Sequence, residues 1–202
     1  MAYELYPAFK HWMPTHGNIW FYSDPHFGDE ESWLLRKQFV CATDNVEAFD
    51  NLQIATINKT CGKNDTLVIL GDVGNIECVK KLKAKKKILI LGNHDRGASY
   101  YADVFDEVYT GPVIIAEKLI LTHEPIDFPY AVNIHGHDHA GTKRKGHLNI
   151  CADAISYTPI NFNQFLKSGA SSKIQTIHRE TIDKATKRKK KRGGRKIGER
   201  RN

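Results

Sequence analysis

The 202-residue sequence contains no long hydrophobic run. A helix that spans a bilayer needs about 20 consecutive apolar residues, and no segment approaches that length. The first 17 residues are polar and aromatic without an apolar stretch, which is not the pattern of a secretory signal peptide. These absences exclude an integral membrane protein, and we expect a cytoplasmic protein with no membrane partner.

Cysteine is scarce, and its spacing excludes the usual cysteine-based scaffolds. The four cysteines, Cys41, Cys61, Cys78 and Cys151, lie far apart in the sequence and form no Cys-x-x-Cys pair. A zinc ribbon needs such pairs, and a disulfide framework needs more cysteines in a shorter chain. We therefore expect buried thiols in a reducing compartment.

Acidic residues are rare at the carboxyl end, where the positive charge gathers. The net charge is +7, but Lys184–Asn202 holds eleven lysines and arginines against Glu199, so this segment carries +10 and residues 1–183 carry −3. Such a segment cannot bury enough apolar surface to fold alone, which predicts a disordered basic tail. Two other interpretations stay open: an arm that binds nucleic acid or another polyanion, and a localisation signal.

Five apolar runs dominate the rest of the chain, and each ends in aspartate, asparagine or histidine. A short apolar run that ends in polar loop residues is typical of a buried strand. In α/β proteins, ligands bind outside the carboxyl ends of the strands, so we expect the residues after these runs to build one site. The predicted strands are Ile19–Ser23, Thr66–Leu70, Ile88–Leu91, Leu119–Thr122 and Ala131–His135.

Helical patterns separate the first three of these strands. We predict helices in 30–39, in 46–60 after an N-cap at Thr43, and in 75–84, and this alternation indicates a parallel, helix-covered sheet. Later connections are short, which predicts a second, more antiparallel sheet. Its further members would be Tyr109–Ala116 and His147–Ile150, followed by a helix at Pro159–Leu166 and a strand at Lys173–His178.

The polar residues at the strand ends form a set of metal donors. Oxygen and imidazole groups without a thiol suit manganese, iron or zinc. They exceed the needs of one ion, whereas two ions about 3.5–4 Å apart, bridged by a carboxylate, would use most of them. The set comprises Asp24, His26, Asp72, Asn93, His94, Asp95, His123, His137 and His139.

The order of these motifs resembles the calcineurin-like metallophosphoesterase family. The sequence shows Asp-x-His at 24–26, Gly-Asp-x-Gly at 71–74, Gly-Asn-His-Asp at 92–95, a lone His123, and Gly-His-x-His at 136–139. The similarity runs from about Asn18 to Phe165 and is greatest to small bacterial and phage phosphoesterases. It implies an α/β fold, a four-layer α/β/β/α sandwich of two mixed sheets flanked by helices. We expect an N-terminal extension at 1–17, this domain at 18–183 and the basic tail at 184–202.

The resemblance also implies a role for each motif residue. Asp24, His26 and His139 would hold the first metal ion, Asn93, His123 and His137 the second, and Asp72 would bridge both. His94 would contact the phosphate and protonate the leaving oxygen, while Asp95 would orient His94 or act only as a helix cap. The implied cofactor is a pair of divalent ions, Mn²⁺ first, with iron, zinc, nickel or magnesium as alternatives.

The implied activity is hydrolysis of a phosphoester by a hydroxide that bridges the two ions. No inserted cap domain interrupts the motifs, so the site would be open, and with the basic tail this favours phosphodiesters of the nucleotide or nucleic-acid type. Phosphomonoester hydrolysis and a catalytically idle, protein-binding scaffold remain the alternatives. Arg36 and Arg96 would pair with a substrate phosphate or form surface ion pairs.

Overall fold

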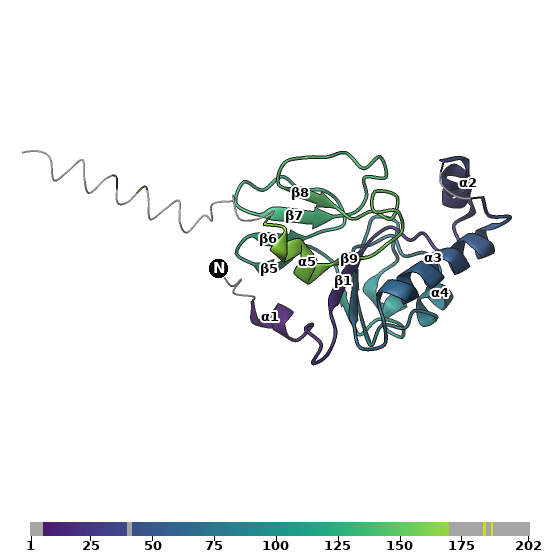
Figure 1. Ribbon diagram of the computed structural model, residues 1–202, viewed down its shortest axis with the longest axis horizontal. Helices are drawn as coiled ribbons and strands as arrows, with labels where there is room; N and C mark the ends of the chain where they lie inside the picture. Colours follow the sequence, from purple (N-terminus) through teal and green to yellow (C-terminus); the bar gives the residue numbers. More distant parts are fainter. Residues whose placement is uncertain (1–5, 40–41, 170–183, 185–186, 188–202) are drawn as a thin grey trace, which may run out of the picture.

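The computed structural model describes residues 6–39 and 42–169, together with Lys184 and Lys187 (Figure 1). The predicted strand Lys173–His178 and almost all of the basic tail lie outside the described residues. Within them, the chain forms two β-sheets that pack face to face, with helices against the outer face of the first sheet (Figure 1).

The first sheet carries the predicted alternation of strand and helix. Its strand order is β4-β3-β2-β1-β9, with parallel pairing from β1 through β4 and antiparallel pairing of β9 with β1. Parallel pairing brings the carboxyl ends of neighbouring strands to one edge of the sheet. The strands are β1 (Ile19–Tyr22), β2 (Thr66–Ile69), β3 (Lys86–Ile90), β4 (Glu107–Tyr109) and β9 (Ile160–Asn161).

The second sheet is less antiparallel than predicted. It contains β5 (Val113–Ala116), β6 (Leu119–Leu121), β7 (Val132–His135) and β8 (His147–Asn149), in that order. Only β5 and β6 form an antiparallel pair. The difference arises because residues 122–131 and 136–146 cross over the sheet instead of turning back, and a crossover connection places strands in parallel.

The helices differ from the predictions mainly at their ends. Asn45, not Thr43, caps the third helix, because its side chain accepts a hydrogen bond from Ala48 N at 2.8 Å. The predicted helix at Pro159–Leu166 divides into β9 and a helix that Asn161 caps, and the predicted strand Tyr109–Ala116 divides into β4 and β5 in different sheets. The helices are α1 (Pro7–Lys10), α2 (Glu30–Phe39), α3 (Val46–Thr60), α4 (Ile76–Lys80) and α5 (Phe162–Lys167), with a 3₁₀ turn at Ala98–Tyr101.

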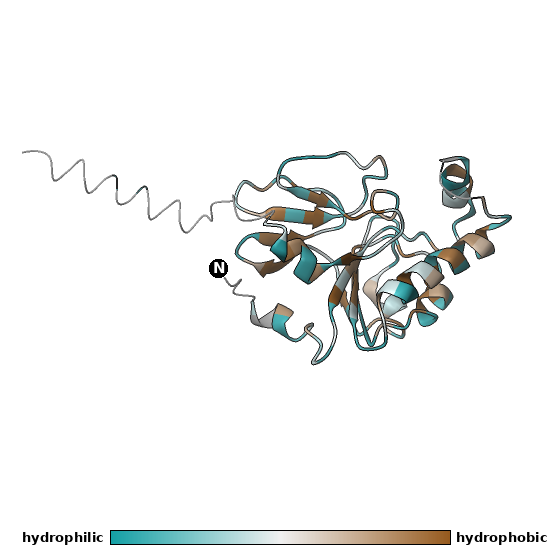
Figure 2. Cartoon of the chain, viewed as in Figure 1, coloured by the Kyte–Doolittle hydropathy of each residue, from teal (hydrophilic) through white to brown (hydrophobic). Residues whose placement is uncertain are grey.

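Two hydrophobic layers hold these elements together. Along β2, Leu67 and Ile69 pack toward α3 and α4, whereas Val68 packs into the layer between the sheets, as the period of two in a strand requires. Figure 2 shows hydrophobic colour in the strands and hydrophilic colour along the loops. Phe9 and Trp12 join the layer between the sheets, so the described part of the predicted N-terminal extension packs into the domain. The predicted α/β fold of two mixed sheets with flanking helices is confirmed.

The structure also describes the cysteines and the length of the helices. Cys61, Cys78 and Cys151 are buried free thiols. Among the described helices, none is long and apolar enough to cross a membrane.

Glu107 anchors the amino-terminal segment to the first sheet. Its carboxylate accepts hydrogen bonds from Tyr109 Oη at 2.6 Å, Trp12 Nε1 at 2.9 Å and Lys86 Nζ at 3.1 Å, and it pairs with His11 Nε2 at 2.7 Å. Burial would raise the pKa of this carboxyl group, but the four partners outweigh burial and lower the pKa to about 2.

This network predicts acid-sensitive stability. The unfolded chain titrates Glu107 near an ordinary pKa of about 4.3, so its contribution is complete above that pH and is lost as the pH falls toward 2. We expect Glu107→Gln to lower the free energy of unfolding by about 2–3 kcal/mol at pH 7, and by roughly half as much at pH 3. Urea unfolding at both pH values measures this, and equal losses at the two would contradict it.

Candidate metal centre

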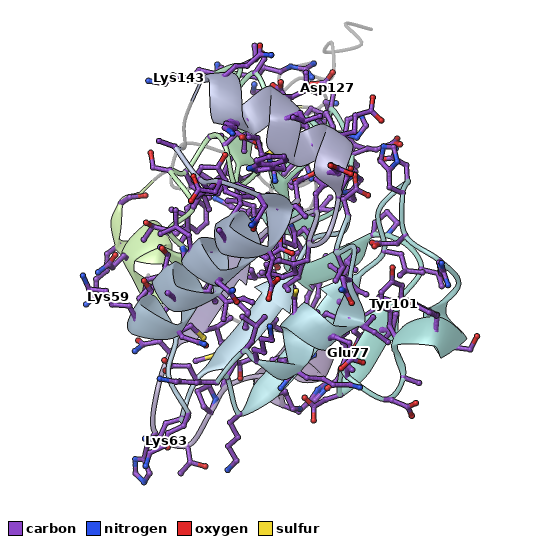
Figure 3. The ribbon with its side chains drawn as sticks, turned by 90° about the vertical axis from the view of Figure 1, so that its right-hand side faces the viewer. Lys59, Lys63, Glu77, Tyr101, Asp127 and Lys143 are labelled. Carbon is purple, nitrogen blue, oxygen red and sulfur yellow. The ribbon has the colours of Figure 1, made fainter. Side chains whose placement is uncertain are left out.

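The predicted donor residues lie at the carboxyl edge of the first sheet. The ends of β1 and β2 are joined there, since Ser23 Oγ donates to Leu70 O at 2.6 Å and Asp24 N donates to Gly71 O at 3.1 Å. Figure 3 orients the molecule: Lys63, in the turn before β2, and Lys143, in the loop after β7, lie at opposite ends. The donor residues come from loops at the Lys143 end of the strands.

Four of the predicted ligands have strained backbones. Asp24, His26, Asp72 and His137 have φ values of 57°, 48°, 52° and 63°, and they are four of the six non-glycine residues with positive φ in the described chain. Each such conformation costs on the order of 1–3 kcal/mol, and such strain clusters at functional sites. These four strained conformations therefore lower the stability of the fold while they direct the side chains toward the candidate site.

The first group of donors surrounds the amide oxygen of Asn93. Asn93 Oδ1 lies 2.8 Å from His123 Nε2 and 3.0 Å from His137 Nδ1, and the two histidine nitrogens lie 3.3 Å apart. His123 is held because its other ring nitrogen, Nδ1, contacts Leu70 O at 2.7 Å. Three donor atoms thus converge, as the second predicted metal set requires.

The second group surrounds Asp24. His139 Nε2 lies 3.7 Å from Asp24 Oδ1, and the rings of His26 and His139 have centroids 5.3 Å apart. Asp24 is completely buried, and its two carboxylate oxygens receive the backbone N–H of His137. His26 Nε2 is buried and has no hydrogen-bond partner among the described residues. A buried imidazole nitrogen without a hydrogen-bond partner is suited to bind a metal ion.

Asp72 lies between the two groups. Its Oδ2 is 3.4 Å from His123 Nε2 and 3.6 Å from His26 Nε2, while Oδ1 accepts a hydrogen bond from His94 N at 3.0 Å. Donor atoms of Asp24, Asp72 and His123 all lie within 4.8 Å of one another. The donor set, made of carboxylate, amide and imidazole groups, fits divalent metal ions.

A close backbone approach makes this packing possible. A Cβ atom at Gly136 would collide with Ser23 Oγ and Asp24 Oδ2, so only glycine fits where β7 ends against β1. This contact brings the loop that carries His137 and His139 against the loop that carries Asp24 and His26.

The carboxylates dominate the electrostatics of the centre. Burial would lower the pKa of His123, but Asp72 and Asp24 outweigh burial and raise the pKa to about 9. Burial would likewise raise the pKa of Asp72, yet the His123 ring and the His94 N–H hold it below its usual value. The pKa of His26 is lowered by burial and by the nearby Arg36 guanidinium. The centre is therefore poised to attract cations.

The structure places His94 and Asp95 in different surroundings. His94 is exposed at the mouth of the centre, with its ring centroid 5.8 Å from that of His26. The Asp95 carboxylate accepts the backbone N–H groups of Gly92, Asp72 and Val73 at 2.7–2.9 Å, and the Tyr101 hydroxyl at 2.8 Å. No described hydrogen bond joins Asp95 to the His94 ring. Asp95 fixes the loops that carry the predicted ligands.

The two predicted substrate arginines also differ. Arg36 is buried, and its guanidinium donates to Asp153 and to the backbone carbonyls of Asp24 and Pro25. It is neither a surface residue nor free to bind phosphate. Arg96 is exposed, and its guanidinium carbon lies 4.5 Å from the centroid of the Tyr100 ring.

An open cleft of about 630 Å³ leads into the centre. Its lining includes His26, His94 and His139, together with Ser32 and Leu35 of α2. Asp29 and Glu31 also line the cleft and make it acidic near α2.

Sequence reasoning missed Asp153 and Cys151. The Asp153 carboxylate contacts His139 Nδ1 at 2.7 Å, and the Cys151 thiol lies 3.4 Å from the same nitrogen. One signal was available: Asp153 is the single charged residue within the otherwise apolar run Ile150–Ile155. A lone carboxylate in a buried run needs a partner of opposite charge or a donor.

Comparisons with known proteins identify the family of the chain. Residues 17–189 match the calcineurin-like phosphoesterase family. The Gene 66 protein of Mycobacterium phage L5 is 35% identical over 86 residues, which cover 39% of this chain and 40% of the phage protein.

Two solved structures are also similar. A protein of unknown function, AQ665 from Aquifex aeolicus, superposes with a TM-score of 0.61 at 26% identity, covering 75% of this chain and 99% of that one. The Pseudomonas putida nuclease MPE reaches a TM-score of 0.41 at 22% identity, covering 60% of this chain and 61% of that one. Since the family match spans most of the sequence, the chain belongs to the calcineurin-like phosphoesterase family.

Proposed function

We propose that the protein hydrolyses phosphodiesters with two divalent metal ions held by the predicted ligands. Asp24, His26 and His139 hold the first ion, Asn93, His123 and His137 hold the second, and Asp72 bridges them. The position of the Asp72 carboxylate carries this proposal, because Oδ2 lies within 3.6 Å of donor nitrogens from both groups. The ligand set suits Mn²⁺, our first choice, and also accommodates iron, zinc, nickel or magnesium.

The ions, when bound, lower the pKa of water and neutralise charge on the phosphate. The chain supplies the remaining functions. His94, exposed at the cleft, is placed to give a proton from its ring to the leaving oxygen. Asp95 holds the loops at Gly92 and Asp72 together by accepting hydrogen bonds from their backbone N–H groups. The distance between His94 and the Asp72 carboxylate is therefore fixed.

The charges around the cleft favour a diester over a monoester. A phosphomonoester carries a second negative charge that needs an additional cation or donor. Arg36 is the one lysine or arginine among the cleft-lining residues, and it is committed to Asp153, while Asp29 and Glu31 repel a dianion. A phosphodiester, with one negative charge and an apolar group placed along Leu35, suits these surroundings better.

We propose further that Lys184–Asn202 contributes a non-specific attraction for nucleic acid. Its charge of +10 supports this role, since lysine and arginine release counterions from phosphates on binding. Nucleic-acid substrates and a cytoplasmic location are the corresponding predictions for the cell.

Hydrolysis of two chromogenic esters tests the substrate class. We expect the manganese-loaded protein to cleave bis(p-nitrophenyl) phosphate with a kcat/KM at least 10-fold above that for p-nitrophenyl phosphate, about 1.4 kcal/mol in activation free energy. The reverse order would favour a phosphomonoesterase acting on metabolites or phosphoproteins. Two bound ions without cleavage of either ester would favour the idle scaffold.

A further inference from the structure

Asp153, just beyond the end of β8, belongs to none of the metal-binding motifs, yet its carboxylate contacts several residues. One oxygen, Oδ2, accepts hydrogen bonds from Arg36 Nη2 at 2.9 Å and Nε at 3.2 Å, and contacts His139 Nδ1 at 2.7 Å. The other, Oδ1, accepts the Tyr157 hydroxyl at 2.7 Å. Both oxygens are therefore engaged, and the carboxylate is fixed in position by Tyr157 four residues away and by two more distant partners, Arg36 and His139.

The contact with His139 decides which ring nitrogen faces the metal centre. With Nδ1 donating to Asp153, the proton-free nitrogen is Nε2, and this is the atom that points toward Asp24 Oδ1. His139 lies on a long loop, and its side chain is 44% exposed. Packing alone does not hold the ring, so the Asp153 hydrogen bond sets its orientation.

Arg36 connects the same carboxylate to the other ligand loop. Its Nη2 donates to Asp24 O at 2.7 Å, and its Nη1 donates to Pro25 O at 3.0 Å. These two carbonyls lie in the strained segment between the ligands Asp24 and His26. One buried guanidinium therefore joins α2, the loop after β1 and, through Asp153, the loop that carries His139.

We propose that Asp153 and Arg36 are positioning residues of the first metal ion. Asp153 fixes the tautomer and direction of His139, and Arg36 fixes the Asp24–His26 loop relative to it. Outer hydrogen bonds to metal-binding histidines typically change metal affinity by about 10–100-fold when they are removed. This inference rests on the proposed assignment of Asp24, His26 and His139 to one ion.

Manganese titration of the full-length chain tests the inference. We expect Asp153→Asn, which keeps the shape and removes the charge, to weaken one of two binding events by about 10–100-fold and to leave the other unchanged. Nitrogen-15 NMR of the metal-free protein gives an independent readout: the His139 ring should be protonated at Nδ1 in the wild type and should show mixed tautomers in Asp153→Asn.

A second variant and a matched control separate positioning from folding. Arg36→Lys keeps the charge but loses the forked geometry, so it too should weaken one binding event. Glu107→Gln breaks a comparable carboxylate network where the amino-terminal segment contacts the first sheet. This variant should lower stability without changing either manganese affinity.

The outcomes are distinct. Wild-type manganese affinities in Asp153→Asn, or in Arg36→Lys should Asp153→Asn fail to fold, would overturn the inference, whatever happens to the melting temperature. Weakened binding at one site with an unchanged histidine spectrum would also overturn the assigned role of Asp153. A wild-type protein that binds two ions but cleaves no ester would refute the proposed function and leave this test of metal positioning intact.

Discussion

Asp72→Asn is expected to lower kcat for phosphodiester hydrolysis by at least about 10³-fold, which corresponds to about 4 kcal/mol of activation free energy. The side chain is almost completely buried, and Oδ2 lies between nitrogens of both donor groups. Asparagine keeps the size of the group but removes the negative charge that offsets two divalent ions. Metal analysis after gel filtration should show fewer than two manganese ions per chain.

A charge-matched control keeps this result interpretable. Asp103 is exposed and makes no side-chain hydrogen bond or ion pair within the described part of the chain. Asp103→Asn removes the same charge and should retain both manganese ions and full turnover. An Asp72→Asn protein that binds two ions and turns over substrate at the wild-type rate would refute the bridging role.

The clustering of the donor residues was largely predictable because these residues follow a local rule. Each apolar run ends in a polar motif, and parallel pairing of β1, β2 and β3 brings those ends to one edge of the sheet. The sequence could place Asp24, Asp72 and Asn93 in this way without any long-range information. Their individual roles as ligands remain predictions.

The hydrogen bonds between Arg36 and Asp153 were not predictable, because they depend on long-range contacts. Arg36 and Asp153 are separated by 117 residues, and no local period links them. On α2 the pattern is even reversed, because Leu34 and Leu35 are 50% and 59% exposed while Arg36 is 5% exposed. A hydrophobic pattern places an arginine outside and a leucine inside, whereas a buried arginine is stable here only because a distant carboxylate and two carbonyls satisfy it.

The direction of the strands in the second sheet was also hidden from the sequence. A short connection and a crossover of similar length have similar composition, and the choice between them depends on how the sheet packs. Asn133 illustrates this, since its amide is buried and bonded to Thr122 Oγ1 and Ile126 N from the crossover itself. These contacts exist only once the parallel arrangement has formed.

His94→Ala gives the second large effect, and the leaving group determines its size. The His94 ring is exposed at the cleft, so its removal should leave folding and metal content unchanged. General-acid catalysis contributes about 10²–10⁴-fold where the leaving oxygen needs a proton. For a dinucleotide, whose leaving group is a poorly acidic alcohol, we expect kcat to fall by at least about 10²-fold.

For bis(p-nitrophenyl) phosphate the same variant should lose less than about 10-fold, because p-nitrophenolate leaves without protonation. The ratio between the two substrates isolates proton transfer from metal binding, since a damaged metal centre would slow both substrates equally. Equal losses would instead assign His94 to binding the phosphate. A plot of log kcat against leaving-group pKa extends the comparison, and the slope should become steeper in His94→Ala because the alanine variant has no proton to offer the departing oxygen.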